Sequence, residues 1–178
     1  IKAKAMSVEI ANWAPGDIAN QFIAGKAAMY TDGPWRIGTL KKDAKFDWGV
    51  TVLPKGPNGY NTVLGGHNMG LIKGKNVEGG WKLFKYMNQP ENMVKFNTAE
   101  NYIPARKDVT ESTDYYKNDP IMKVFVQAMN DAKPRYPSKN FPKIDEAVQV
   151  MLQSVIVGSQ TPEQAAKEAA KTVEPLLK

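Results

Sequence analysis

Residues 22–35 read FIAGKAAMYTDGPW and show how the first third of the chain is built. A short helix with Asp17 as its N-cap is predicted to end at Gly25, because glycine adopts the left-handed conformation that closes helices. The small residues of segment 27–31 predict a strand. Glycine and proline then turn the chain sharply, which places Trp35 at the end of that strand.

Alternation of apolar and polar residues predicts further extended segments, and helical spacing predicts the helices that follow. The extended segments are 46–53, 62–64 and 69–72, and the helices are 76–88, 90–100, 119–133, 144–158 and 161 to the C-terminus. Asp119-Pro120 and the Thr161–Gln164 capping box mark two helix starts. The periodic aromatic residues Trp48, Trp81 and Phe84 are predicted to pack in the core. An α/β class follows, but so few extended segments make a poor sheet, which suggests that partners are missing.

Composition narrows the classes of function. The 178 residues carry 24 Lys and Arg against 18 Asp and Glu, a net charge of +6, but the basic residues are scattered singly among acids rather than clustered. We therefore expect no nucleic-acid partner. There is no cysteine, and no apolar run has the roughly 18 to 20 residues that a membrane span requires.

Motifs for catalysis and cofactors are scarce. The sequence has neither a nucleotide-binding glycine loop nor the Gly-x-Ser-x-Gly elbow of serine hydrolases, and its single histidine, His67, has no second histidine to share a metal. We expect no metal and no cofactor. Two acids, Asp32 and Asp145, remain candidates for a glycosidase pair, because paired carboxylates meet only in the fold.

Aromatic residues are instead concentrated at turns. They lie beside glycine, proline or asparagine at Trp13, Trp35, Tyr60, Tyr102, Tyr136 and Phe141. A sugar site needs a flat aromatic surface with polar donors around it, because a sugar ring has an apolar face and a rim of hydroxyls. Trp35 with Asp32, and Arg106 near Tyr102, fit this need.

Several motifs together resemble one known family. In order they are residues 22–29, Gly33-Pro34-Trp35, Trp48-Gly49-Val50 with Leu53-Pro54, Gly65-Gly66, Tyr102-Ile103-Pro104-Ala105, Asp119-Pro120 and residues 158–165. Their order and spacing resemble the extracellular solute-binding proteins of sugar ABC transporters, in the maltose-binding-protein-like group. The resemblance covers nearly the whole chain.

The resemblance implies a periplasmic-binding-protein type II-like fold with two lobes, of which this chain supplies the C-terminal half. Residues 1–66 would then form the first part of the second lobe, 67–118 would cross to complete the first lobe, and 119–178 would return to the second. The missing N-terminal half of the same protein would be a partner of this chain.

The resemblance also implies the ligand-binding residues. Trp35 corresponds to a tryptophan that stacks on a sugar ring, in a turn shaped by Gly33 beside Asp32. Gly65 and Gly66 correspond to small residues at the lobe crossing, where backbone amides approach the ligand, and Arg106 corresponds to a position at the cleft edge. His67 and Asn68 follow Gly65 and Gly66 within reach of the cleft, although His67 could equally be an incidental loop residue.

One departure from the family concerns Asp145. Relatives that bind maltose carry a stacking aromatic residue near this position, whereas this chain has Ile144-Asp145-Glu146. Asp145 would lie in the first turn of its helix, where it either accepts hydrogen bonds from sugar hydroxyls or interacts with the helix dipole. Maltodextrin specificity is therefore in doubt.

The predicted function is a non-catalytic substrate-binding component of an ABC transporter. It captures a sugar or short oligosaccharide and delivers it to permease subunits in the membrane. The resemblance implies a periplasmic or extracellular location, with a lipid anchor upstream as an open alternative. The alternatives are a glycosidase that uses Asp32 and Asp145, and a module whose partner is another protein.

Overall fold

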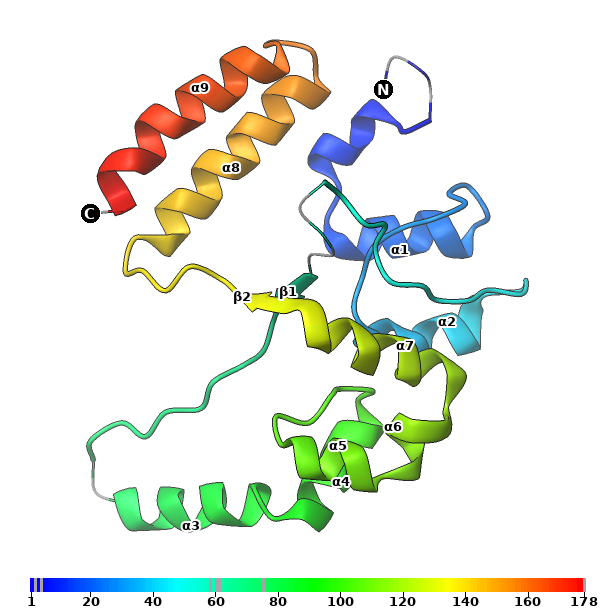
Figure 1. Cartoon of the computed structure of the whole chain (residues 1–178), viewed down its shortest axis with the longest axis vertical. Helices are drawn as coiled ribbons and strands as arrows, with labels where there is room; N and C mark the ends of the chain where they lie inside the picture. The colour runs from blue at the N-terminus through cyan, green and yellow to red at the C-terminus, as the bar shows by residue number, and fades with distance from the viewer. Residues whose placement is uncertain (2, 4, 58, 60–61, 75, 178) are drawn as a thin grey trace. The chain divides into compact units, whose positions relative to one another are not determined.

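The computed structural model describes residues 1, 3, 5–57, 59, 62–74 and 76–177 (Figure 1). The chain divides into two compact units. Unit 1 combines Ile1–Tyr30 with Tyr136–Lys178, and unit 2 is the continuous stretch Thr31–Arg135. The predicted lobe segments 1–66, 67–118 and 119–178 use other boundaries and stay a prediction.

Unit 2 holds most of the elements. In chain order they are η2 (Pro34–Arg36), α2 (Ile37–Asp43), β1 (Thr62–Leu64), α3 (Val77–Met87), α4 (Pro90–Ala99), α5 (Lys107–Ser112), α6 (Asp114–Asn118), α7 (Pro120–Ala128), η3 (Met129–Asp131) and β2 (Ala132–Pro134). The predicted helices 76–88 and 90–100 are confirmed as α3 and α4. The helix predicted over 119–133 is confirmed at its start but ends at Ala128, where a 3-10 turn begins.

The core of unit 2 forms where α2, α6 and α7 meet. Ile37, Tyr116 and Met122 are buried together, and partly buried residues pack around them, namely Trp48, Ile103, Tyr115, Ile121, Phe125 and Val126. The predicted core position of Trp48 is confirmed. The start of α7 is fixed by Asp119, whose carboxylate accepts hydrogen bonds from the backbone N–H groups of Ile121 and Met122, each at 2.9 Å.

The sheet of unit 2 is small. β1 and β2 pair in parallel, with Thr62 opposite Ala132 and Leu64 opposite Pro134. The predicted strand at 62–64 is confirmed, and its partner is a segment that we expected to lie at a helix end. The strands predicted over 27–31, 46–53 and 69–72 are wrong, because these described residues belong to no strand.

Unit 1 is helical within the described residues. It contains η1 (Val8–Asn12), α1 (Pro15–Ile23), α8 (Phe141–Ile156), α9 (Pro162–Val173) and η4 (Glu174–Leu177). Helices α8 and α9 pack side by side as a hairpin (Figure 1). The predicted capping box is confirmed, since Thr161 Oγ1 accepts from the N–H of Gln164 and the Gln164 side chain accepts from the N–H of Thr161.

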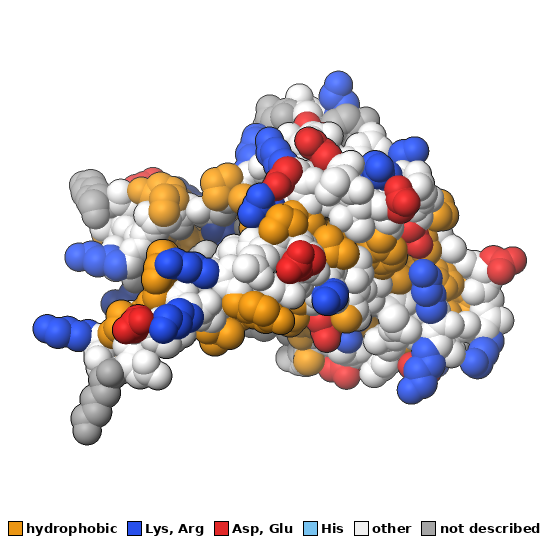
Figure 2. Space-filling model, turned by 90° about the horizontal axis from the view of Figure 1, so that it is seen from below, with side chains coloured by type: hydrophobic (Ala, Val, Ile, Leu, Met, Phe, Trp, Pro, Cys, Tyr) orange, Lys and Arg blue, Asp and Glu red, His pale blue; other side chains and the backbone are white. Residues whose placement is uncertain are grey.

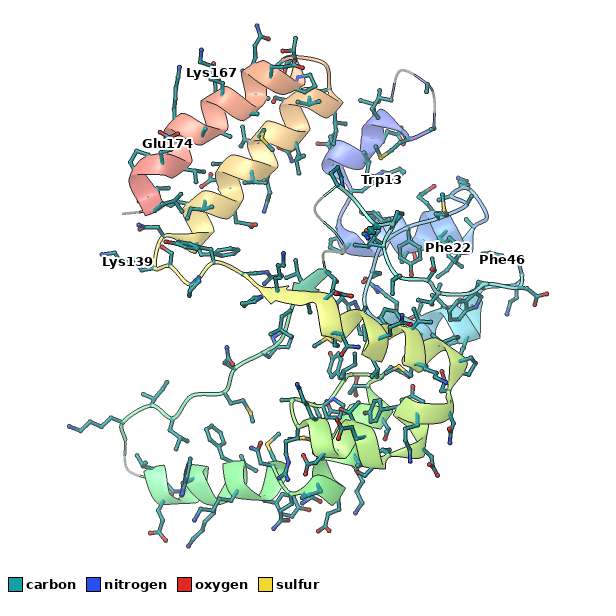
Figure 3. All side chains as sticks on the ribbon, viewed as in Figure 1. Trp13, Phe22, Phe46, Lys139, Lys167 and Glu174 are labelled. Carbon is teal, nitrogen blue, oxygen red and sulfur yellow. The ribbon has the colours of Figure 1, made fainter. Side chains whose placement is uncertain are left out.

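Two expectations at helix starts in unit 1 are wrong. Helix α1 begins at Pro15, so Asp17 is its third residue rather than its N-cap, and the Asp17 carboxylate instead accepts the N–H of Ala14 at 2.8 Å. Helix α8 begins at Phe141 and not at residue 144. Gly25 follows α1 with a φ of 70°, as the sequence predicts. Phe22 on α1, labelled in Figure 3, packs its ring against Tyr30 with 4.9 Å between ring centroids.

An apolar surface lies open on unit 2. Along α3, Val77, Trp81, Leu83 and Tyr86 are all exposed, and Ile72, which precedes the helix, is 91% exposed. The predicted core position of Trp81 is therefore wrong for the described chain, in which this side chain is 53% exposed. Figure 2, which looks at the end of unit 2 formed by α3, α4 and α5, shows such hydrophobic side chains between lysines, arginines and acids. Phe84 of the same helix is partly buried.

Candidate functional site

Trp35 lies in the 3-10 turn η2, two residues after Gly33 and two residues before the buried Ile37. The backbone N–H of Arg36 donates to the carbonyl oxygen of Gly33 at 3.2 Å, which closes the turn. Two residues after Trp35, the side chain of Ile37 is only 2% exposed, while Trp35 itself is 52% exposed. The chain is thus held at Ile37 while the indole stays accessible to solvent.

Asp32 is hydrogen-bonded on both sides of this turn. Its Oδ1 accepts the N–H of Gly33 at 2.8 Å, and its Oδ2 accepts from Nε of Arg36 at 3.0 Å. The Asp32 side chain is 13% exposed and that of Arg36 28%, so this ion pair is better shielded than an ordinary surface pair. Each carboxylate oxygen of Asp32, the candidate glycosidase acid, thus accepts one hydrogen bond from the protein.

The segment Gly65–Asn68 follows directly from the carboxyl end of β1. All four residues are exposed. In the described chain, no atom beyond the adjoining residues lies within 4 Å of the point where a Cβ would stand on Gly65 or Gly66. The close approach that these glycines predict is therefore not made by any described residue, and contact of this segment with a ligand stays a prediction.

Arg106 uses its guanidinium within unit 2. Its Nε and Nη2 both donate to the carboxylate of Asp108, and its Nη1 donates to the carbonyl oxygen of Asn88 at 3.2 Å. The hydrogen bonds and opposite charge raise the pKa of Arg106 and hold the pKa of Asp108 below its ordinary value. Arg106 therefore ties the start of α5 to the end of α3, and its predicted role toward a sugar stays a prediction.

Asp145 belongs to unit 1. Because α8 starts at Phe141, Asp145 is its fifth residue, and the prediction that it lies in the first turn is wrong. Its Oδ2 accepts a hydrogen bond from Nε2 of Gln149 at 2.7 Å. The helix dipole acts mainly on the first turn, so it offers little to this carboxylate.

The structure groups only part of the predicted site. Asp32, Gly33 and Trp35 form one contact group, whereas the hydrogen bonds of the described residues connect neither Arg106 nor Gly65–Asn68 to it. Tyr60, one of the aromatic residues predicted at turns, lies outside the described residues. Tyr136 is exposed, and its hydroxyl donates to the carbonyl oxygen of Leu177 at 3.4 Å.

Sequence reasoning did not single out two polar residues of unit 2, Arg36 and Asn101. Arg36 stands four residues after Asp32, a spacing that favours an ion pair and could have identified it. Asn101 has a φ of 56° and accepts a hydrogen bond from the hydroxyl of Tyr115 at 2.5 Å. Asparagine tolerates this left-handed conformation better than most residues, but no motif marks the position.

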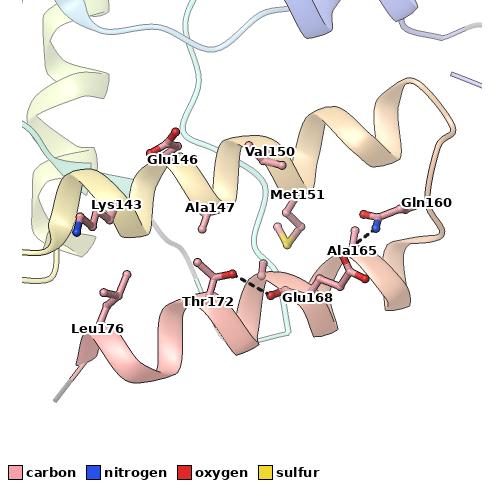
Figure 4. Close-up of a pocket in the computed structure, with 11 residues that line it drawn as sticks. Lys143, Glu146, Ala147, Val150, Met151, Gln160, Ala165, Glu168, Thr172 and Leu176 are labelled. Atoms are coloured by element: carbon pink, nitrogen blue, oxygen red, sulfur yellow. Dashed lines mark hydrogen bonds between the residues drawn. The ribbon is translucent and has the colours of Figure 1, made fainter.

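Unit 1 contains a groove between α8 and α9, shown in Figure 4. It encloses about 500 Å³ and is lined by aliphatic side chains such as Met151 and Val150, with Lys143, Glu146 and Glu168 at its rim. None of the residues that line it is aromatic, so it lacks the flat surface on which the sugar prediction depends. Asp145 is not among its lining residues.

The part of the chain that the structure describes contains neither a candidate metal site nor a candidate membrane span. No group of three or more acidic, histidine or cysteine side chains is arranged to hold a metal ion there. No described helix has the length and hydrophobicity to cross a membrane.

Comparison with known proteins identifies the family of the chain. The profile of the bacterial extracellular solute-binding proteins matches residues 2–124. A binding protein of Brucella abortus is 26% identical over 95% of this chain. The sn-glycerol-3-phosphate-binding periplasmic protein of Escherichia coli K12 is 27% identical over 89% of it. The chain spans 42% and 40%, respectively, of the length of these two curated relatives.

Solved structures agree on the fold. The maltose-maltodextrin binding protein of Alicyclobacillus acidocaldarius is 25% identical and superposes with a TM-score of 0.72, over 92% of this chain and 45% of that one. An ABC transporter solute-binding protein of Thermotoga lettingae, bound with α-D-tagatose, is 23% identical with a TM-score of 0.77, over 96% and 47%. The expected mixed α/β, type II periplasmic-binding-protein fold is confirmed. The chain belongs to the family of bacterial extracellular solute-binding proteins.

Proposed function

We propose that this chain forms part of the substrate-binding component of an ABC transporter, which captures a sugar or short oligosaccharide and delivers it to the membrane permease. One observation carries the choice of ligand. The Trp35 indole is half exposed, although the turn that bears it is anchored by buried Ile37 and by the shielded Asp32–Arg36 pair. A rigid, accessible aromatic face suits the apolar face of a pyranose.

The site needs more than unit 2 alone. The relatives are about twice as long as the part of them that this chain covers, so we infer that the remaining half of the same protein supplies the other side of the ligand site. A hinged two-lobe receptor then signals to the permease by closing, because the ligand makes more contacts in the closed state. Stacking with a few hydrogen bonds supports micromolar affinity, about −8 kcal/mol.

We also propose that the protein is periplasmic or extracellular and that it is not an enzyme. The matched family is extracellular and the Escherichia coli relative is named as periplasmic, which supports a periplasmic or extracellular location for this protein. Its relatives are binding proteins, and the Asp32 carboxylate is engaged in the turn by hydrogen bonds from Gly33 and Arg36, which supports a structural role for it. Release of reducing ends from oligosaccharides, lost in Asp32→Asn, would contradict the non-enzymatic proposal.

The test uses the protein at its full natural length and a panel of maltose, D-tagatose and sn-glycerol 3-phosphate. A ligand that binds raises the melting temperature and quenches tryptophan fluorescence. We expect Trp35→Ala to abolish the quenching by a sugar. Trp81→Ala is the matched control, because Trp81 lies in the same unit and is equally exposed. Quenching that persists in Trp35→Ala would contradict the proposal, and binding of only the glycerol phosphate would contradict the sugar assignment.

A further inference from the structure

The Trp35 ring lies against the α-carbon of Gly33. A Cβ built on Gly33 would stand 2.1 Å from both Cη2 and Cζ3 of the indole and 2.5 Å from Cε3. Non-bonded carbon atoms do not approach one another this closely, so the ring occupies the space that the Cβ of any other residue at position 33 would fill. The indole of Trp35 and the side chain of a larger residue 33 are mutually exclusive in this arrangement.

The three distances also show which part of the indole is covered. Two points in the plane of the ring lie 2.1 Å from both Cη2 and Cζ3. One lies outside the ring edge, much farther from Cε3 than the observed distance, and the other lies inside the ring, much closer to Cε3 than the observed distance. The observed 2.5 Å instead puts the missing Cβ above the face of the six-membered ring. Gly33 therefore covers one face of the indole. The half exposure of Trp35 leaves other parts of the ring accessible.

Backbone conformation does not explain the glycine. Gly33 has a φ of −109° and a ψ of 174°, which is ordinary extended backbone open to any residue. What requires glycine here is the space taken by the indole. A substitution to alanine thus tests the position of the ring without straining the backbone.

Asp32 and Arg36 hold this arrangement from both sides. Asp32 accepts the N–H of Gly33, the residue that covers the ring, and the Nε of Arg36, the residue that follows Trp35. The Asp32 carboxylate therefore bridges Gly33 and Arg36, the two residues that fix the direction in which the Trp35 side chain projects. The Arg36 backbone N–H adds the turn-closing bond to Gly33, and Ile37 anchors the next position in the core.

We infer that Gly33, Asp32 and Arg36 are positioning residues that present Trp35 as a one-sided stacking platform. Gly33 supports one face, and the ligand stacks only on the other, so the platform accepts a single pyranose face rather than a ring held between two surfaces of this unit. The inference rests on the proposed function for its ligand, but the geometry of the platform can be tested without one.

The first experiment observes the indole directly in the ligand-free protein labelled with 5-fluorotryptophan. The ¹⁹F NMR signals of the four tryptophans in this part of the protein are assigned with single Trp→Phe variants. We expect Gly33→Ala and Arg36→Met to shift the Trp35 signal and leave those of Trp48 and Trp81 in place. Gly49→Ala is the matched control, because Gly49 has open space where a Cβ would stand and lacks a positive φ. Arg36→Lys retains the charge and should restore part of the wild-type shift.

The second experiment measures affinity for maltose and D-tagatose by calorimetry in the full-length protein. For a sugar that Trp35→Ala no longer binds, Gly33→Ala should weaken binding about tenfold or more, at an unchanged melting temperature. Gly49→Ala should not weaken it.

Unchanged Trp35 signals in both Gly33→Ala and Arg36→Met would overturn the inference even if Gly33→Ala alone fails to fold. A shifted signal with unchanged affinity for that sugar would overturn the positioning role. Failure of Trp35→Ala to affect any sugar would instead overturn the proposed function, while the ligand-free spectra still report on the support by Gly33.

Discussion

The hydroxyl of Tyr116 donates a hydrogen bond to the backbone carbonyl oxygen of Tyr102 at 3.0 Å. Tyr116 is 1% exposed and belongs to the same buried cluster as Ile37 and Met122. The bond therefore attaches the Tyr102–Ala105 segment, one of the motifs on which the family resemblance rests, to the core of unit 2. That core also anchors the turn of Trp35 through Ile37.

The pH dependence of stability should reveal the buried hydroxyl of Tyr116. Burial, with a smaller contribution from Tyr115, raises the pKa of Tyr116 to about 12. The unfolded chain loses this proton near pH 10 while the folded chain keeps it, so the free energy of unfolding should fall as pH rises from about 10 to about 12. Tyr116→Phe should be less stable at neutral pH but lack this part of the alkaline loss. Urea unfolding followed by circular dichroism across this range measures the difference, with the exposed Tyr136→Phe as control. Parallel curves for wild type and Tyr116→Phe would contradict the assignment.

Packing at Met122 should dominate the stability of unit 2. Its side chain is completely buried between the core residues of α2 and α6. Met122→Ala should lower the free energy of unfolding by about 2 to 5 kcal/mol, because it removes buried surface and leaves a cavity. Met69→Ala, the same substitution at a methionine that is 54% exposed, should change it by less than about 1 kcal/mol. Denaturant unfolding of both variants measures the contrast, and equal effects would show that Met122 is not a core residue.

Local signals in the sequence predicted the helix starts well where a side chain caps its own helix. Asp119-Pro120 and the Thr161–Gln164 box form as expected, because each interaction is complete within a few residues. Asp17 shows the limit of such reasoning. The same carboxylate can cap the N–H three residues earlier, from inside the helix, and the sequence alone does not distinguish the two arrangements.

Strands were harder to predict because a strand exists only with its partner. Segments 27–31 and 46–53 have the composition or alternation of strands, but no described strand pairs with them. The partner of β1 is Ala132–Pro134, far along the chain, and no residue pattern within either segment predicts the pairing. The helical spacing of Trp81 predicts a core position, yet spacing shows only that a helix face is apolar and not what covers that face.

The candidate site was predicted in part for a similar reason. Trp35, Asp32 and Gly33 are neighbours in sequence, so a turn motif sufficed to group them. Arg36 stands four residues after Asp32, but this spacing indicates only an ion pair and does not by itself mark a residue that supports a site. The contact of Arg106 with Asp108 is local, whereas its contact with Asn88 depends on the packing of α3 against the start of α5, which no motif encodes.

The N-cap at Asp119 offers a test with a graded series. Asp119→Ala should lower the free energy of unfolding by about 0.5 to 2 kcal/mol, because two backbone N–H groups at the start of α7 lose their acceptor. Asp119→Asn should retain most of the stability, since an amide oxygen still caps. Lys41→Met removes only a partly exposed partner 3.7 Å from the carboxylate and should cost less than about 1 kcal/mol. If Lys41→Met costs as much as Asp119→Ala, the ion pair rather than the cap fixes the helix start.

The contact between Arg106 and Asp108 makes a prediction in acid. Hydrogen bonding to Arg106 is the largest cause that lowers the pKa of Asp108, so Arg106→Met should raise this pKa toward its ordinary value of 3.8. A carboxylate with a lowered pKa in the folded state stabilises that state above the unfolded pKa, and this stabilisation is lost as the pH falls through the folded pKa. Wild type should therefore lose more stability below about pH 4 than Arg106→Met. Carboxyl ¹³C NMR titration of Asp108 measures the pKa, with Lys107→Met as a control that removes a neighbouring cation. An equal rise in both variants would show that general positive charge, and not the Arg106 hydrogen bonds, sets the pKa of Asp108.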